Sequence, residues 1–166
     1  MAGPDDILLT DKVAVVTGGG GGIGRACALR FAEFGADVVI ADIIPERCEE
    51  TAQRVRELGR RALPFPTDVM EPDRIRAMIA AADTEFGRID ILVNNAGGVS
   101  YKPFMEQSER SWRKHIDINL ISMLCATQEA ARVMIRGRHG GWIGTVAWIA
   151  ALRAGPSVAA SAPCHA

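Results

Sequence analysis

The sequence predicts an α/β fold, a doubly wound parallel sheet covered by helices on both faces, and two observations lead to this class. Short runs rich in β-branched residues alternate with longer segments that have helical periodicity. The short runs are almost continuously apolar, as strands are when helices cover both faces of a sheet. Because right-handed crossovers connect such strands, we expect a parallel sheet in a single domain that spans 1–166.

Five segments have the composition of strands, and the third differs from the others. Two prolines, Pro64 and Pro66, interrupt it, and each removes a backbone donor from the hydrogen-bond ladder. We therefore expect this strand at an edge of the sheet. In chain order the segments are 12–17, 36–42, 61–68, 90–97 and 140–146.

Helical segments separate the strands, and proline and glycine mark the ends of two of them. Pro45 and Pro72 open helices that end at Gly59 and Gly87, the usual asymmetry of helix termini. The remaining helices are 23–34 and 108–136. We expect the first helix to bury the stripe Ile23, Ala26, Cys27, Phe31 and Phe34. We expect the long helix to bury Trp112, Ile116, Asn119, Met123, Ala126 and Ala130.

Composition and charge exclude several classes of function. The net charge of −1 leaves no electrostatic footprint for nucleic acid or for an anionic membrane surface. The four cysteines form no C-x-x-C pair and have no histidine at metal-ligand spacing, so we expect reduced thiols and no metal site. The N-terminus lacks the apolar run of a signal peptide, and no segment is apolar enough to span a bilayer. These features favour a cytoplasmic protein.

Five consecutive glycines join the first strand to the first helix. A flexible linker would be out of place between a buried strand and a helix that begins at once. Glycine lets such a turn take positive φ and approach a phosphate closely, and the helix N-terminus attracts the phosphate charge. We therefore predict a cradle for the pyrophosphate of a dinucleotide. Two spacings fit: G-x-G-x-x-G on Gly19, Gly21 and Gly24, and T-G-x-x-x-G-I-G on Thr17, Gly18, Gly22, Ile23 and Gly24.

An acidic residue, Asp42, ends the second strand, roughly 20 residues after the glycines, where it can accept both hydroxyls of the adenosine ribose. A carboxylate there would repel a 2′-phosphate, and Ile43 and Ile44 offer no cation to receive one. The pattern predicts NAD rather than NADP as the cofactor. The alternative is a solvent-exposed aspartate at the end of a strand.

Taken together, these motifs resemble the short-chain dehydrogenase/reductase family in its NAD-binding form, over residues 11–160. The motifs are TGGGGGIG (17–24), Asp42, DV (68–69), NNAG (94–97) and DINL (117–120). The resemblance implies a Rossmann-like fold and hydride transfer between a nicotinamide and a secondary alcohol or ketone. It also implies cofactor-binding roles for Gly18, Gly21, Gly22, Ile23, Gly24, Asp42, Asp68, Val69, Asn95, Ala96 and Gly97.

Asn119 is a candidate catalytic residue. An amide on a buried helix face is costly unless it is hydrogen-bonded, and asparagine is a poor helix former. The resemblance implies that the matching asparagine orders a water beside a catalytic lysine. The alternative is an asparagine bonded to a neighbouring carbonyl for packing alone.

The positions that the family fills with a catalytic serine, tyrosine and lysine carry other residues here, Trp148, Ser161 and His165. A serine hydroxyl is a far weaker acid than a phenol, and a histidine lacks the permanent charge of a lysine. Trp148 offers only an indole donor, and we expect its ring to fill part of the substrate pocket. We therefore expect turnover by this chain to be impaired or absent.

Compared with the family, the chain stops early, before a helix and two strands. The sheet is then incomplete at its C-terminal edge, and we expect the fifth strand to be exposed. Family members are homo-oligomers, and the usual interface helix is missing here. A one-base deletion in a Tyr-Ser-Ala coding stretch would produce the Ser-Ala-Pro of 161–163. Two functions stay open: an oxidoreductase for a small-molecule alcohol or ketone, and an NAD-binding module or regulatory partner without catalysis.

Overall fold

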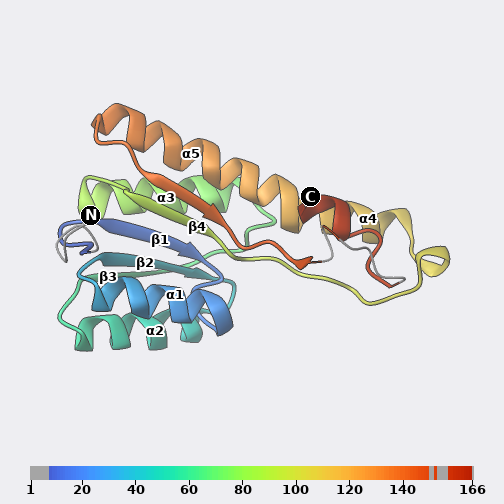
Figure 1. Ribbon diagram of the computed structural model, residues 1–166, viewed down its shortest axis with the longest axis horizontal. Helices are drawn as coiled ribbons and strands as arrows, with labels where there is room; N and C mark the ends of the chain where they lie inside the picture. The colour runs from blue at the N-terminus through green and yellow to red at the C-terminus, as the bar shows by residue number, and fades with distance from the viewer. Residues whose placement is uncertain (1–7, 150–151, 153–156, 166) are drawn as a thin grey trace.

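The chain folds into a five-stranded parallel sheet between two layers of helices (Figure 1). This computed structural model describes residues 8–149, 152 and 157–165. The strands lie in the order β3-β2-β1-β4-β5, so the chain builds outward from β1 first on one side and then on the other. The predicted doubly wound fold class is confirmed. The strands are β1 (Val13–Thr17), β2 (Asp37–Asp42), β3 (Ala62–Pro66), β4 (Ile91–Asn94) and β5 (Trp142–Thr145).

Helices cover both faces of the sheet. On one face lie α1 (Gly22–Glu33) and α2 (Pro45–Glu57), and on the other lie α3 (Pro72–Phe86) and α5 (Ser122–Gly137) (Figure 1). Pro45 and Pro72 open α2 and α3 as predicted. Among the described residues, no helix combines the length and the apolar character that crossing a membrane requires.

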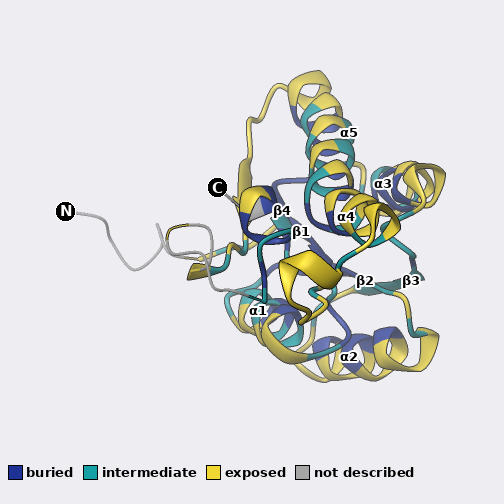
Figure 2. Ribbon diagram, turned by 90° about the vertical axis from the view of Figure 1, so that its right-hand side faces the viewer, coloured by how far each residue is buried: buried dark blue, intermediate teal, exposed yellow. Residues whose placement is uncertain are grey.

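Two apolar clusters form the core, one on each face of the sheet. Side chains alternate along a strand, so Val38 and Ile40 of β2 pack with α1 and α2. Their neighbours Val39 and Ala41 pack instead with α3 and α5. Figure 2 shows the buried residues where the helices meet the strands. The burial of both faces explains why β1 and β2 are apolar along almost their whole length.

The buried stripe of α1 differs from the predicted one. Gly24, Ala28 and Ala32 are buried, while Ile23 is exposed at the start of the helix. The helix approaches the sheet so closely that only small side chains fit between them, and larger residues flank the contact. The predicted stripe was therefore wrong for Ile23 and Ala26, which are exposed, whereas Phe31 packs partly buried against the core.

The long helix is not a continuous α-helix. A π-helical turn at Asp117–Ile121 joins α4 (Glu109–Ile116) to α5, and this turn changes the face that the preceding residues present to the core. Trp112 and Ile116 are therefore exposed, contrary to the prediction, and His115 is buried. Asn119, Ala126 and Ala130 are buried as predicted.

The two edge strands match the expectations from sequence. β3, with Pro64 and Pro66, has β2 as its single partner strand in the described part of the chain. β5 pairs with β4, and within the described part of the chain no strand covers its outer side. Trp142 on this edge is 66% exposed.

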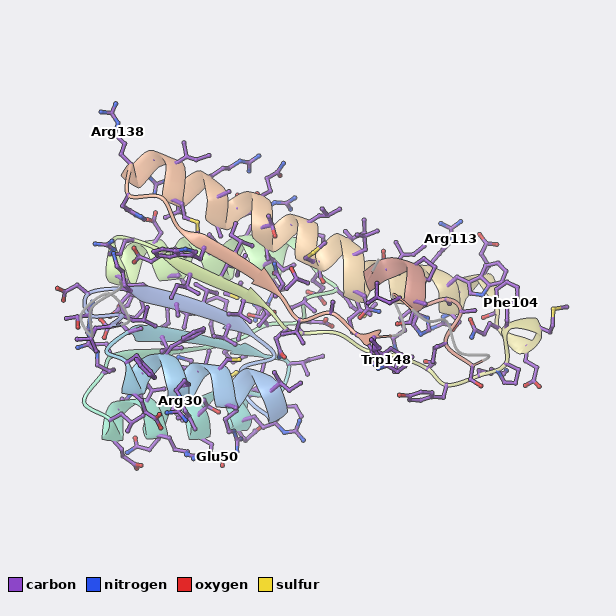
Figure 3. The ribbon with its side chains drawn as sticks, viewed as in Figure 1. Arg30, Glu50, Phe104, Arg113, Arg138 and Trp148 are labelled. Atoms are coloured by element: carbon purple, nitrogen blue, oxygen red, sulfur yellow. The ribbon has the colours of Figure 1, made fainter. Side chains whose placement is uncertain are left out.

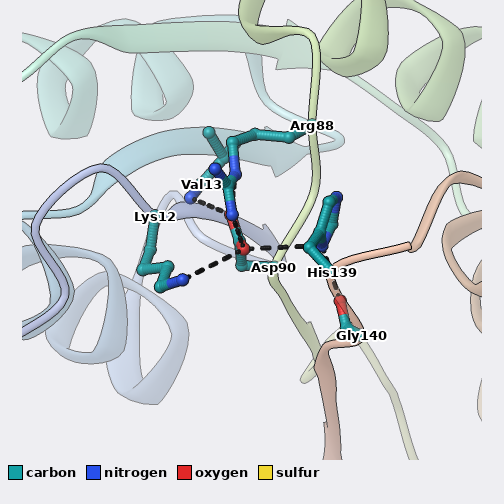
Figure 4. Close-up of polar contacts among 6 residues, drawn as sticks. All are labelled: Lys12, Val13, Arg88, Asp90, His139 and Gly140. Atoms are coloured by element: carbon teal, nitrogen blue, oxygen red, sulfur yellow. Dashed lines mark hydrogen bonds and ion pairs between the residues drawn. The ribbon is translucent and has the colours of Figure 1, made fainter. Parts of the chain in front are cut away.

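A buried carboxylate, Asp90, joins the start of β1 to the segment that enters β4 (Figure 4). Its Oδ2 accepts hydrogen bonds from Val13 N (3.0 Å) and Arg88 Nε (2.8 Å), and its Oδ1 accepts one from Arg88 Nη2 (2.6 Å). Lys12 Nζ and His139 Nδ1 lie 3.7 Å from Oδ1. Burial alone would raise the pKa of Asp90, but the hydrogen bonds from Arg88 and Val13 outweigh burial and hold this pKa below its usual value.

Asp90→Asn is expected to lower the free energy of unfolding by about 3 kcal/mol near neutral pH, because an amide cannot accept from both Arg88 and Val13 as the carboxylate does. The folded-state pKa of Asp90 is depressed, so its contribution is present above the unfolded pKa and is lost as the pH falls toward the folded one. Urea unfolding near neutral pH and at about pH 3 should therefore show the difference between wild type and variant shrinking in acid.

The control for this experiment is Asp73→Asn, at a side chain that is 95% exposed. It should change stability by less than about 0.5 kcal/mol. An Asp90→Asn loss of the same size at both pH values would contradict the role of the ionised carboxylate.

Candidate functional site

The carboxyl ends of the neighbouring strands β1 and β4 lie side by side, and the connections that follow them leave for opposite faces of the sheet (Figure 1). A cleft opens at these ends. Two adjoining cavities occupy it. The Asp42 cavity, about 180 Å³, is lined by Gly18, Asp42, Ile43, Thr67, Asp68, Val69, Ala96, Gly97 and Ile118. The Trp148 cavity, about 240 Å³, has among its lining residues Thr17, Asn95, Asn119, Trp148 and Ser161. Because both cavities include Val69, Ala96 and Gly97, one extended ligand can lie across them.

The glycine run makes a sharp turn between β1 and α1. Gly18 and Gly22 have φ values of 63° and 50°, a region that other residues disfavour. These two positions favour the T-G-x-x-x-G-I-G spacing over the alternative. Gly21, just before α1, provides no side-chain cap, and the first turn of the helix contains no acidic residue. The uncapped N–H groups and the helix dipole therefore favour an anion at this point of the cleft.

Asp42 ends β2 beside the glycine run, where the main chain fixes its carboxylate. Oδ2 accepts a hydrogen bond from Gly20 N (3.1 Å), and Oδ1 accepts one from Ile44 N (3.1 Å). Each oxygen keeps a further acceptor position for a ligand. The Cys48 thiol lies against the Asp42 carbonyl oxygen, and burial together with the Asp42 charge raises the pKa of this thiol to about 11. Cys48 is therefore a packing residue rather than a nucleophile.

Thr17 and Asn95 join the carboxyl ends of β1 and β4. Thr17 Oγ1 accepts hydrogen bonds from Asn95 N and Ala96 N, both at 3.0 Å. Asn95 Nδ2 donates to Thr17 O (2.9 Å) and to Gly18 O (3.3 Å). Asn95 thus holds the glycine turn in position, a role that its sequence motif did not reveal.

Asn119 is buried, and both atoms of its amide group bond to one residue of the loop after β4. Its Oδ1 accepts from Gly98 N and its Nδ2 donates to Gly98 O, both at 2.9 Å. One turn earlier, His115 Nε2 accepts from Ser100 N (3.0 Å), while its Nδ1 lies 2.7 Å from Ser111 O. These two side chains hold the loop that forms one wall of the cleft, and sequence reasoning missed His115.

Two of the three positions with unexpected residues, Trp148 and Ser161, lie at the end of the cleft away from Asp42. Trp148, labelled in Figure 3, packs together with Val99 against Val158 and Ala162. Its ring meets Tyr101 edge-on at a centroid distance of 6.1 Å. Ser161 is 1% exposed, and its Oγ has no hydrogen-bond partner among the described residues. His165 ends a short 3-10 turn, and its side chain lies outside the described part of the chain. The structure therefore brings Trp148, Ser161 and Asn119 to one cavity.

Two arginines beside the glycine run were also missed. Arg25 Nε and Nη2 donate to Gly20 O at 3.0 and 2.6 Å. The Cβ of Arg47 in α2 lies next to Gly20, as the Asp42 carboxylate does. No spacing rule could find them, because the contacts arise only when α1 and α2 pack beside each other.

Gly24→Ala tests the close approach of α1 to β1. A Cβ at Gly24 would meet Gly18 O and Asn95 Nδ2 well inside the 3.0 Å below which real contacts do not occur. We expect this variant to lose about 2 kcal/mol of unfolding free energy in chemical denaturation. Gly21→Ala is the matched control, because its added Cβ would meet nothing within 4 Å and its φ of −159° suits alanine. Equal stability of the two variants would show that the approach is looser than described.

The comparisons with known proteins agree with this architecture. A family model described as short chain dehydrogenase matches residues 12–162. The 2-dehydro-3-deoxy-D-gluconate 5-dehydrogenase of Escherichia coli (strain K12) is 39% identical over 156 residues, which cover 92% of this chain and 61% of that protein. The chain thus spans less than two thirds of the length of this relative.

Two solved structures carry the same arrangement of strands and helices. One is 7 alpha-hydroxysteroid dehydrogenase complexed with NADH and 7-oxo glycochenodeoxycholic acid, with a TM-score of 0.94, 32% identity, and coverage of 99% of this chain and 64% of that chain. The other is NAD⁺-bound xylitol dehydrogenase, with a TM-score of 0.89, 30% identity, and coverage of 95% and 60%. With a family match over nearly its whole length and these relatives, the chain belongs to the short-chain dehydrogenase family.

Proposed function

We propose that this chain binds NAD in a single dinucleotide-binding domain, and that the activity of its lineage is hydride transfer between the nicotinamide and a secondary alcohol or ketone. The observation that carries the proposal is the Asp42 carboxylate fixed beside an uncapped helix N-terminus. A dinucleotide needs an acceptor for its ribose hydroxyls and a site for its pyrophosphate close together, and this corner of the cleft provides both.

The described residues fit this cofactor. A side chain at Gly24 would collide with Gly18 O in the glycine turn. Because glycine has none, the N–H groups of Gly22, Ile23 and Gly24 would remain open to the pyrophosphate. Asp42 would hold the adenosine ribose. Bound NAD would supply the hydride acceptor, and the chain itself would supply binding and orientation. The residues that would border the adenine and the path to the nicotinamide are Asp68, Val69, Asn95, Ala96 and Gly97.

The preference for NAD over NADP would depend on Asp42. Its charge stands where a 2′-phosphate would have to lie, and Gly20 and Ile44 hold it there. The Cβ of Arg47 lies next to Gly20, and the Arg47 side chain is exposed. Because this cation could receive a phosphate, the carboxylate is the group that decides between the two cofactors.

The cavity expected to hold the substrate supports binding more than turnover. Oxidation of an alcohol requires a group that takes the hydroxyl proton. Among the described residues that line the Trp148 cavity there is no tyrosine, lysine, histidine or carboxylate. Both polar atoms of Asn119 are engaged by Gly98. This composition favours the second candidate function, an NAD-binding module or regulatory partner that lacks catalysis of its own.

The substrate class and cellular setting follow from the same features. Val69, Met123 and Trp148 give the Trp148 cavity apolar walls, which suits a small-molecule alcohol or ketone. Four free cysteines are consistent with a reducing compartment such as the cytoplasm.

Asp42→Asn is expected to weaken NAD binding about tenfold and to strengthen NADP binding, because the charge that excludes the 2′-phosphate is removed. Isothermal calorimetry with both cofactors measures the ratio of the two Kd values. In Asp42→Asn combined with Arg47→Gln, the gain in NADP affinity should disappear. Glu46→Gln, which removes the same charge from an exposed site on α2, is the control. An unchanged ratio in Asp42→Asn would refute the assignment of Asp42.

The wild-type chain is expected to bind NAD in calorimetry and yet form no NADH from a panel of secondary alcohols, because the described lining of the Trp148 cavity contains no tyrosine, lysine, histidine or carboxylate to take the proton. Absorbance of the reduced nicotinamide measures turnover. Steady NADH formation would refute the hypothesis of an NAD-binding module without catalysis and would favour the oxidoreductase. Absence of NAD binding would remove both candidate functions.

A further inference from the structure

The glycine run holds one defined shape although its sequence favours many. Five consecutive glycines have more backbone freedom than any other five residues, so a fixed turn must be held by contacts from outside. Gly19 N bonds Ala41 O at 2.9 Å and fixes the first part of the run against β2. The next residue, Gly20, is held by charged side chains on both of its polar atoms.

Arg25 is the group that holds the Gly20 carbonyl. Its Nε and Nη2 converge on Gly20 O at 3.0 and 2.6 Å. The guanidinium is itself fixed: Nε also contacts Thr51 Oγ1 (3.1 Å), and Nη1 and Nη2 form a two-pronged pair with Glu50, each at 2.9 Å. A planar arginine fork suits such a set of bonds, whereas a lysine would supply only a point charge. The Arg25 side chain is 23% exposed, so this pair is partly shielded from water.

The direction of the Gly20 carbonyl determines the direction of the next N–H group. In a trans peptide the C=O and the following N–H point to opposite sides, and the described chain contains no cis peptide. Because Arg25 holds Gly20 O on its own side, the N–H of Gly21 faces away from Arg25. If this peptide flipped, a carbonyl oxygen would replace an N–H group at the start of α1, where an anion is favoured.

We propose that Arg25 is a positioning residue for the diphosphate of the cofactor: it orients the Gly20–Gly21 peptide without touching the ligand. The inference rests on the proposed function, because it assigns the open side of the glycine turn to the diphosphate. Glu50 and Thr51 contribute to this positioning, because they hold the Arg25 guanidinium in place. The pair with Glu50 also neutralises the charge that Arg25 would need to attract a phosphate directly.

The test is the affinity of Arg25→Gln for ADP and for adenosine, measured by calorimetry or by titration of resolved NMR signals. We expect the Kd for ADP and for NAD to rise about tenfold, while the Kd for adenosine changes less than about twofold. The control is Arg30→Gln on the same helix, an exposed arginine (Figure 3) that pairs, among the described residues, with Glu33 alone. It should leave all three Kd values unchanged.

Glu50→Gln separates positioning from direct contact. If Arg25 touched the phosphate, removing the charge of Glu50 would free the guanidinium and tighten ADP binding. If Arg25 acts through Gly20, loosening its anchor should weaken ADP binding by about two- to threefold. Because Glu50 is 58% exposed, this variant should fold even if Arg25→Gln does not.

Three results would overturn the proposal: wild-type affinity for ADP in Arg25→Gln, an equal loss for ADP and adenosine, or tighter ADP binding in Glu50→Gln. Failure of the wild-type chain to bind NAD or ADP is a different result, and it would refute the proposed function itself.

Discussion

The first turn of α1 lies against the end of β1 with no space for a side chain between them, and the cleft depends on this contact. Gly24 is the residue at the point of closest approach, facing Gly18 and Asn95. The approach brings a helix N-terminus to the place where the strand order reverses, and it lets Asn95 reach across from β4 to the glycine turn. A larger residue at position 24 would push α1 away from both the glycine turn and the loop after β4.

Three charged side chains hold the main chain at the two ends of the sheet. Asp90 accepts from Val13 N at the start of the sheet, Asp42 accepts from Gly20 N at its far end, and Arg25 donates to Gly20 O. Each contact satisfies a backbone group that would otherwise lack a partner where strands begin or end. The two carboxylates differ in the acceptor positions that stay free for a ligand. Asp90 is enclosed by its partners, while Asp42 keeps acceptor positions toward the cleft.

The fold and half of the site could be read from the sequence because they depend on local patterns. Apolar strands, the edge position of the Pro64 strand, the glycine turn and Asp42 all follow from spacing and residue type. The buried face of α1 could not, because the close approach at Gly24 selects small residues over the larger ones that hydrophobicity favours. Arg25 and His115 were missed for a related reason: their partners, Gly20 O and Ser100 N, are backbone atoms brought near by packing. The π-helical turn before α5 likewise has no sequence signature that periodicity could detect.

The position of Trp148 gives the cleft an optical reporter. The chain has three tryptophans and one tyrosine, and Trp148 is the tryptophan in the cavity wall, with that tyrosine edge-on beside it. Trp142 on the open strand and Trp112 on α4 are in contact with water, so their fluorescence is a nearly constant background. A molecule that displaces water from the Trp148 cavity changes the polarity around one indole ring, and the emission of the unlabelled protein follows its occupancy.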